Sequence, residues 1–214
     1  PPFAGGDCES CHSMPDSVGK ISFAEGTSKN SVCASCHEEQ TKSESRTTPH
    51  PAVTADNCSD CHRPHNSRLD KLLVKDEGKI CQECHTEVLT PTDKGKHEPV
   101  LMGQCDKCHD VHGSDTPHML KKSGSELCLG CHTTFAMARD SAMSVHTAVD
   151  DCLSCHNPHE GEGKNLLKRP VEKLCSDCHE PDGEALSAKS NHSPYATGNC
   201  AGCHSPHYSS QKHL

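Results

Sequence analysis

Cysteine and histidine recur together along this chain in one pattern, Cys-x-x-Cys-His. The pattern occurs nine times and uses all 18 cysteines. Cysteines three residues apart lie on one face of a helical turn, so both sulfurs of a motif can bond to one planar ligand. The histidine that follows can then bind a metal at the centre of that ligand. The motifs, numbered 1 to 9, are Cys8-Cys11-His12, Cys33-Cys36-His37, Cys58-Cys61-His62, Cys81-Cys84-His85, Cys105-Cys108-His109, Cys128-Cys131-His132, Cys152-Cys155-His156, Cys175-Cys178-His179 and Cys200-Cys203-His204.

This spacing is the attachment signature of c-type haem. The two thiols form thioethers with the vinyl groups of one porphyrin, and the histidine is the proximal ligand of its iron. The sequence therefore predicts nine covalently bound haems c. Two other interpretations explain it less well. A disulfide scaffold does not require a histidine after every second cysteine. Zinc ribbons need two cysteine pairs per metal, and nine motifs do not divide into pairs.

A second set of histidines surrounds motifs 3, 5, 7 and 9, whose first cysteines are 47 or 48 residues apart. Each of these motifs has an upstream histidine and a tail histidine, which lies three residues after the proximal one. Recurrence in register at four motifs favours distal ligation of iron over a surface role. The upstream histidines are His50, His97, His146 and His192, and the tail histidines are His65, His112, His159 and His207.

The histidine count predicts two histidine ligands on every iron and therefore low reduction potentials, because ten histidines remain for nine distal positions. Motif 1 has no extra histidine nearby in sequence, whereas His213 is surplus at the other end. We expect His213 to ligate the motif 1 haem of the next subunit, which gives a head-to-tail homopolymer. The alternative ligand of that haem is His118 or water.

An upstream histidine, a C-x-x-C-H motif and a tail histidine alternate with a plain C-x-x-C-H. This arrangement resembles the doubled-C-x-x-C-H multihaem cytochromes, from His50 to His207. That family includes periplasmic subunits of porin–cytochrome conduits and extracellular filament cytochromes of metal-respiring bacteria, so the resemblance implies electron transfer. Motif 1 departs from the pattern, since Pro15 occupies the tail position.

The elements that hold these motifs must be short, because the composition cannot form an ordinary core. Only 31% of the 214 residues are hydrophobic, 2% are aromatic and tryptophan is absent. We expect one elongated domain, 1–214, of short α-helices and loops wrapped around a linear haem stack, with little or no β-sheet. Its two-haem repeats would be 46–92, 93–140 and 141–187, with partial repeats 1–45 and 188–214. The longest helices are expected over 31–46 and 125–139, each with a serine N-cap.

The function predicted is electron transfer without catalysis, either in a subunit of an extracellular filament or in a periplasmic or porin-embedded cytochrome. A reductase with an open iron at motif 1 is the competing enzyme class. The net charge of −9 argues against nucleic acid as a partner. No apolar stretch is long enough to span a membrane. We expect an exported chain, extracellular or periplasmic, whose partners are redox proteins or extracellular acceptors.

Overall fold

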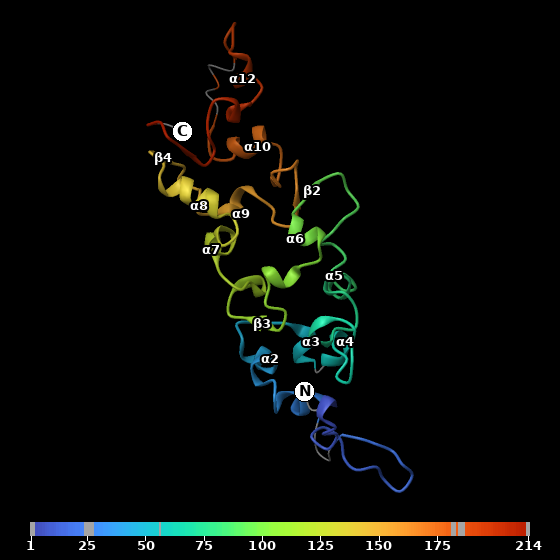
Figure 1. Cartoon of the computed structure of the whole chain (residues 1–214). Coiled ribbons are helices and arrows are strands. Elements are labelled where there is room, and N and C mark those ends of the chain that lie inside the picture. Colours follow the sequence, from blue (N-terminus) through green and yellow to red (C-terminus); the bar gives the residue numbers. More distant parts are fainter. Residues whose placement is uncertain (1–2, 24–27, 56, 181–182, 184–186, 213–214) are drawn as a thin grey trace. The chain divides into compact units, whose positions relative to one another are not determined.

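A computed structural model describes residues 3–23, 28–55, 57–180, 183 and 187–212 (Figure 1). The chain forms two compact units. One contains Pro1–Cys84 and Gly103–Lys121, and the other contains His85–Met102 and Lys122–Leu214. In both units, short helices are joined by long loops, as expected. None of the helices in the described ranges is long and apolar enough to cross a membrane.

The longest described α-helix has 8 residues. The α-helices are α1 (Lys29–Ala34), α2 (Glu38–Thr41), α3 (Pro51–Thr54), α4 (Cys58–Cys61), α5 (Glu77–Gln82), α6 (Glu98–Leu101), α7 (Gly124–Leu129), α8 (Thr133–Asp140), α9 (Cys152–Cys155), α10 (Val171–Ser176) and α12 (Ser193–Ala196). The 3-10 helices are η1 (Phe3–Gly5), η2 (Lys42–Ser45), η3 (Asp70–Leu72), η4 (Cys105–Lys107), η5 (Pro117–Met119) and η6 (Cys200–Gly202).

The described sheet consists of three antiparallel ladders, each two residues long. Each ladder pairs the segment before an upstream histidine with the segment after a tail histidine, so it brings two distant parts of the sequence together. The pairs are β1 (Thr48–Pro49) with β3 (Gly113–Ser114), β2 (Gly95–Lys96) with β5 (Glu160–Gly161), and β4 (Ser144–Val145) with β6 (Tyr208–Ser209). The expectation of little sheet is confirmed.

The prediction of two longer helices over 31–46 and 125–139 is wrong, because the helical backbone of each segment is interrupted at its C-x-x-C-H motif. The helix α1 begins after Ser28, which caps it, and the backbone becomes non-helical at His37, with φ −115° and ψ 48°. In the same way, His132 separates α7 from α8 with φ −84° and ψ 53°. The motif histidine therefore interrupts a helical pattern that periodicity alone would continue.

The polypeptide has almost no interior of its own. In the described ranges, Val149 is the single apolar residue that is buried, at 8% exposure. Large apolar side chains such as Val18 and Met14 remain 84% and 69% exposed. Because burial of apolar surface is the main favourable term in folding, these side chains need a further apolar partner. A bound porphyrin can supply it.

Candidate functional site

Each haem motif is built on one helical turn. In eight motifs, the backbone N–H of the motif histidine donates to the carbonyl of the first cysteine at 2.8 to 3.0 Å. This bond places the two cysteines three residues apart on one turn, which is the arrangement that attachment to one porphyrin requires. No disulfide joins any of the 18 cysteines, all of which lie in the described ranges.

The motifs that carry extra histidines differ locally from the plain ones. Motifs 3, 5, 7 and 9 form isolated turns, α4, η4, α9 and η6. In motif 3 the backbone is extended at His62, with φ −120° and ψ 143°, before Pro64. Motif 5 forms a similar turn with Val111 at the proline position, so proline is not needed to end it. In the plain motifs the first cysteine lies near the end of a six-residue helix, α1, α5, α7 or α10.

Three tail histidines face proximal histidines that lie about fifty residues earlier in the chain. The two rings of each pair are separated by about 6 Å and come from motifs two positions apart in the repeat. The pairs are His12 and His65 (centroids 5.9 Å apart, planes at 39°), His62 and His112 (6.1 Å, 17°), and His156 and His207 (5.9 Å, 16°).

Two upstream histidines face proximal histidines that lie later in the chain. His97 and His132 have centroids 6.2 Å apart and planes at 15°, and His146 and His179 have centroids 6.0 Å apart and planes at 56°. In both cases the proximal partner belongs to the next plain motif. The upstream and tail histidines therefore point to different classes of motif.

The separation within these pairs fits an iron ion between two imidazoles. A metal–imidazole bond is about 2 Å long, so two such bonds in line place the ring centroids about 6 Å apart. Burial and the nearby His62 lower the pKa of His112, and burial and His156 lower that of His207. Both shifts favour the neutral ring that binds metal. In the described ranges, no group of three or more His, Cys, Asp or Glu residues could hold a metal ion, as a zinc site would need.

Motif 1 has no extra histidine nearby in sequence, but the structure brings a tail histidine of the same chain to it. His65 faces His12 although it lies 53 residues further along the chain. The residue expected to supply the ligand from another subunit, His213, lies outside the described residues. The alternative ligand, His118, is exposed, and its backbone carbonyl lies 2.9 Å from Nδ1 of His109.

A hairpin after the motif histidine supplies partners that the sequence interpretation missed. Nδ1 of His62, His109 and His156 lies 2.8 to 2.9 Å from the backbone carbonyl nine residues later, that of Lys71, His118 or Asn165. Such a bond leaves Nε2 of the ring for a metal and fixes the ring orientation. The signal in the sequence is a leucine eleven residues after the histidine, at Leu73, Leu120 and Leu167.

Cysteines of consecutive motifs also meet. The thiol of Cys81 donates a hydrogen bond to the sulfur of Cys105, which raises the pKa of Cys81 and lowers that of Cys105 to about 7. Cys175 and Cys200 interact in the same way, and burial and Cys200 raise the pKa of Cys175. The attachment points of motifs 4 and 5, and of motifs 8 and 9, are therefore adjacent.

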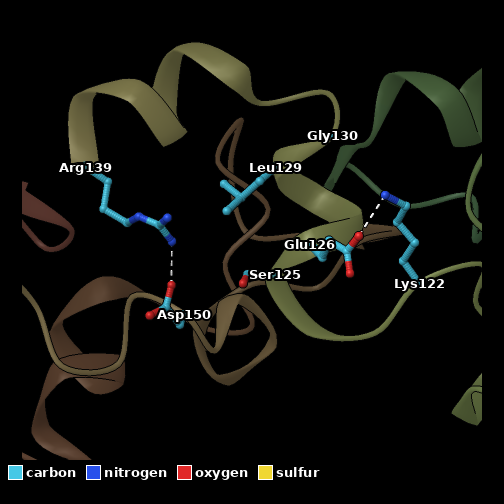
Figure 2. Close-up of a pocket in the computed structure, with 7 residues that line it drawn as sticks. All are labelled: Lys122, Ser125, Glu126, Leu129, Gly130, Arg139 and Asp150. Atoms are coloured by element: carbon cyan, nitrogen blue, oxygen red, sulfur yellow. Dashed lines mark hydrogen bonds and ion pairs between the residues drawn. The ribbon is translucent and has the colours of Figure 1, made fainter. Parts of the chain in front are cut away.

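A pocket of about 630 Å³ lies beside α7 and α8 (Figure 2). Its cations are already paired, since Arg139 contacts Asp150 at 2.5 Å and Lys122 contacts Glu126 at 2.8 Å. Neither the cysteines nor the histidine of motif 6 line it, so it is not the place of a porphyrin. A smaller hollow of about 360 Å³ does lie against two ligand candidates. It is lined by Ser59, His62, Arg63, Pro64, His65 and Asn66.

The chain is similar to a known family and to a characterised cytochrome. The model of the family described as "Doubled CXXCH motif" matches residues 1–42, 50–90, 97–137, 146–184 and 192–214, which is most of the chain. A stretch of 95 residues, 44% of this chain, is 36% identical to the multiheme cytochrome MtrA of Shewanella baltica (strain OS185). The match spans 28% of the length of that relative.

Proposed function

Since this chain belongs to the doubled CXXCH family of multihaem cytochromes, we propose that it transfers electrons over long range through nine bis-histidine haems c. The observation that carries the proposal is the set of five facing histidine pairs. In each pair the distance between the ring centroids leaves room for one metal ion between the two imidazoles. Bound haem supplies the exchange between Fe(II) and Fe(III) by which a site accepts and releases one electron.

The chain's own residues would hold and order the cofactors. The two cysteines of a motif would hold a porphyrin, and the proximal and distal histidines would ligate its iron. Because the facing histidines lie 33 to 53 residues apart, such ligation would also tie two parts of the chain together. Folding is therefore expected to depend on haem attachment. Adjacent cysteines such as Cys81 and Cys105 favour short distances between cofactors.

We propose a carrier of electrons rather than an enzyme. The competing class required an open iron at motif 1, but His12 already faces His65 there. An iron held by two histidines has no position left for a substrate. CO added to the dithionite-reduced holoprotein is therefore expected to leave its visible spectrum almost unchanged. Formation of a CO complex by one haem equivalent would support an open site instead.

The haem count is tested on the intact holoprotein. Its mass should exceed that of the polypeptide by nine haems, and the pyridine haemochrome assay should give nine haems per chain. Low-spin ferric signals in electron paramagnetic resonance are expected for bis-histidine iron. Thiols that react with an alkylating reagent, or a substantial high-spin ferric signal, would contradict the proposal.

We further propose an exported protein whose partners are other redox proteins or extracellular acceptors. His65 faces His12 and is a candidate ligand of the receiving haem from the same chain, which weakens the main argument for the filament hypothesis. In the sequence, His213 lies nine residues after His204. His118 lies at the same offset from His109 in motif 5, where its backbone carbonyl is within hydrogen-bonding distance of Nδ1 of His109. Electron microscopy of the holoprotein and of its His213→Ala variant distinguishes the alternatives. Filaments lost in the variant would restore the hypothesis, whereas single particles in both favour a periplasmic or porin-embedded carrier.

A further inference from the structure

Four hairpins in the chain share one backbone register, and motif 1 has the first of them. In each, the motif histidine pairs with the residue eleven positions later, as in the bridges of His12 with Phe23 and of His62 with Leu73. The next residue also donates its N–H to the carbonyl nine positions later, from Ser13 at 2.9 Å in the first hairpin. The backbone around His12 therefore matches that around His62, His109 and His156.

The side-chain hydrogen bond of the proximal histidine differs at motif 1. In two of the other hairpins the residue that offers its carbonyl to Nδ1, Lys71 or His118, has a φ of 55° or 59°. In the hairpin of motif 7, Asn165 offers its carbonyl without a positive φ, and Leu166 after it has a φ of 55°. In the first hairpin, neither Ile21 nor Ser22 has a positive φ at these two positions. Nδ1 of His12 is buried and has no hydrogen-bond partner among the described residues.

A positive φ at the ninth or tenth position after the motif histidine accompanies the bond in each hairpin that has it, and the residue type at position 21 opposes one in the first hairpin. A β-branched side chain is strongly disfavoured in the left-handed region, whereas lysine and histidine adopt it at a lower cost. With Ile21 and Ser22 both outside that region, neither carbonyl is within hydrogen-bonding distance of Nδ1 of His12. The same ring is stacked on Phe23, with centroids 5.5 Å apart and planes at 19°, where the other hairpins have leucine.

A hydrogen bond from Nδ1–H to a carbonyl makes imidazole a stronger donor to iron, and stronger donation stabilises Fe(III) over Fe(II). We propose that the haem of motif 1 has a higher reduction potential than the haems of motifs 3, 5 and 7, because His12 lacks this bond. An electron that moves among these four sites would rest at motif 1 most often. Ile21 is thus a positioning residue that acts through its backbone, and the inference rests on the proposed function.

The test exchanges the residue type at the same position in two hairpins. Ile21→Asn introduces a residue that adopts the left-handed region, and Ile21→Val keeps the β-branch as its control. Lys71→Val disfavours the first of two consecutive left-handed residues, Lys71 and Leu72, in the hairpin of motif 3. Lys71→Asn is its control, since both variants lose the ammonium group. Each holoprotein is titrated potentiometrically, with visible and low-spin paramagnetic resonance spectra recorded at each potential.

We expect Ile21→Asn to move one haem's share of the titration to lower potential and Lys71→Val to move one haem's share to higher potential. Both controls should titrate as the wild type does. With nine haems attached, an unshifted curve for both Ile21→Asn and Lys71→Val would overturn the inference while the proposed function stands. If Ile21→Asn does not assemble, Lys71→Val decides alone. A wild-type chain without covalent haem would instead overturn the proposed function.

Discussion

The ladders β1–β3 and β2–β5, one in each unit, perform the same task with different side chains. Each places the backbone of an upstream histidine beside that of a tail histidine. In β2–β5 the N–H of His97 donates directly to the carbonyl of His159 at 3.1 Å. Beside β1–β3 the N–H of His50 donates to the hydroxyl of Ser43 at 3.0 Å, and Ser43 is 1% exposed. A buried serine therefore does in one unit what a backbone bond does in the other.

The charges around the two ladders differ as well. In β2–β5, Lys96 and Glu160 form an ion pair whose side chains are 14% and 13% exposed. Thr90 donates its hydroxyl to the same carboxylate at 2.7 Å. Beside β1–β3, Arg46 pairs with Asp115 at 3.1 Å, but the aspartate side chain is 62% exposed. The two units therefore share the backbone geometry of the ladder, whereas the side chains that stabilise it differ from one ladder to the other.

The largest effect is expected at Gly95, opposite Gly161 in β2–β5. A Cβ at Gly95 would lie 2.0 Å from the carbonyl oxygen of Gly163, whereas the counterpart in β1–β3 is Thr48, which has a full side chain. Gly95→Ala is therefore expected to cost about 3 kcal/mol or more in the free energy of unfolding. Urea denaturation followed by haem absorbance measures this cost. Gly5→Ala, with no atom within 4 Å of the new Cβ, is the control.

Ser43→Ala tests the corresponding support of β1–β3. The variant removes a buried acceptor from the N–H of His50, so we expect a loss of about 1 to 3 kcal/mol. The same denaturation experiment applies. Ser45→Ala removes a hydroxyl from the same 3-10 helix that bonds only to the carbonyl of Lys42, and it should change stability by less than about 0.5 kcal/mol. Equal losses in the free energy of unfolding for Ser43→Ala and Ser45→Ala would show that the bond from His50 to Ser43 does not specifically support β1–β3.

Acid should affect the ion pair of β2–β5. Hydrogen bonds from Lys96 and Thr90 lower the pKa of Glu160 to about 2 from its ordinary 4.5. The folded state therefore favours the ionised carboxylate, and this contribution is complete above pH 4.5 and is lost as the pH falls toward 2. Glu160→Gln should be less stable than wild type at pH 6. The gap between their melting temperatures should narrow below pH 4.5, and a gap independent of pH would contradict this account.

The smallest effect is expected at Asp115. Its contacts with Arg46 and the N–H of Thr47 lie at the surface, where solvent and salt screen them. Asp115→Asn should therefore leave the melting temperature within the error of repeated measurements. A clear loss of stability would show that the exposed pair of Arg46 and Asp115 supports β1–β3 as the partly buried pair of Lys96 and Glu160 supports β2–β5.

Much of the site was accessible from the sequence because covalent attachment needs a local pattern. The 18 cysteines and nine proximal histidines follow from C-x-x-C-H alone, and the shortage of apolar residues predicts short elements without a core. The break within 125–139 could not be predicted, because the helical pattern of the sequence continues through His132 whereas the helical backbone is interrupted there. A local pattern determines which residues form a motif turn, but it does not show where the helix ends.

The sequence by itself determined the nine C-x-x-C-H motifs, which are attachment signatures of haem c, and it predicted a shared role for a second set of histidines. Only the tertiary structure decided that His65 faces His12, and that Lys71 offers a carbonyl to His62 where Ile21 offers none to His12. The physical reason is the separation along the chain between the residues that must meet. A thioether turn is closed within five residues, so spacing specifies it. A distal ligand reaches across more than thirty residues, and its partner depends on the ladders and hairpins that fold the chain back.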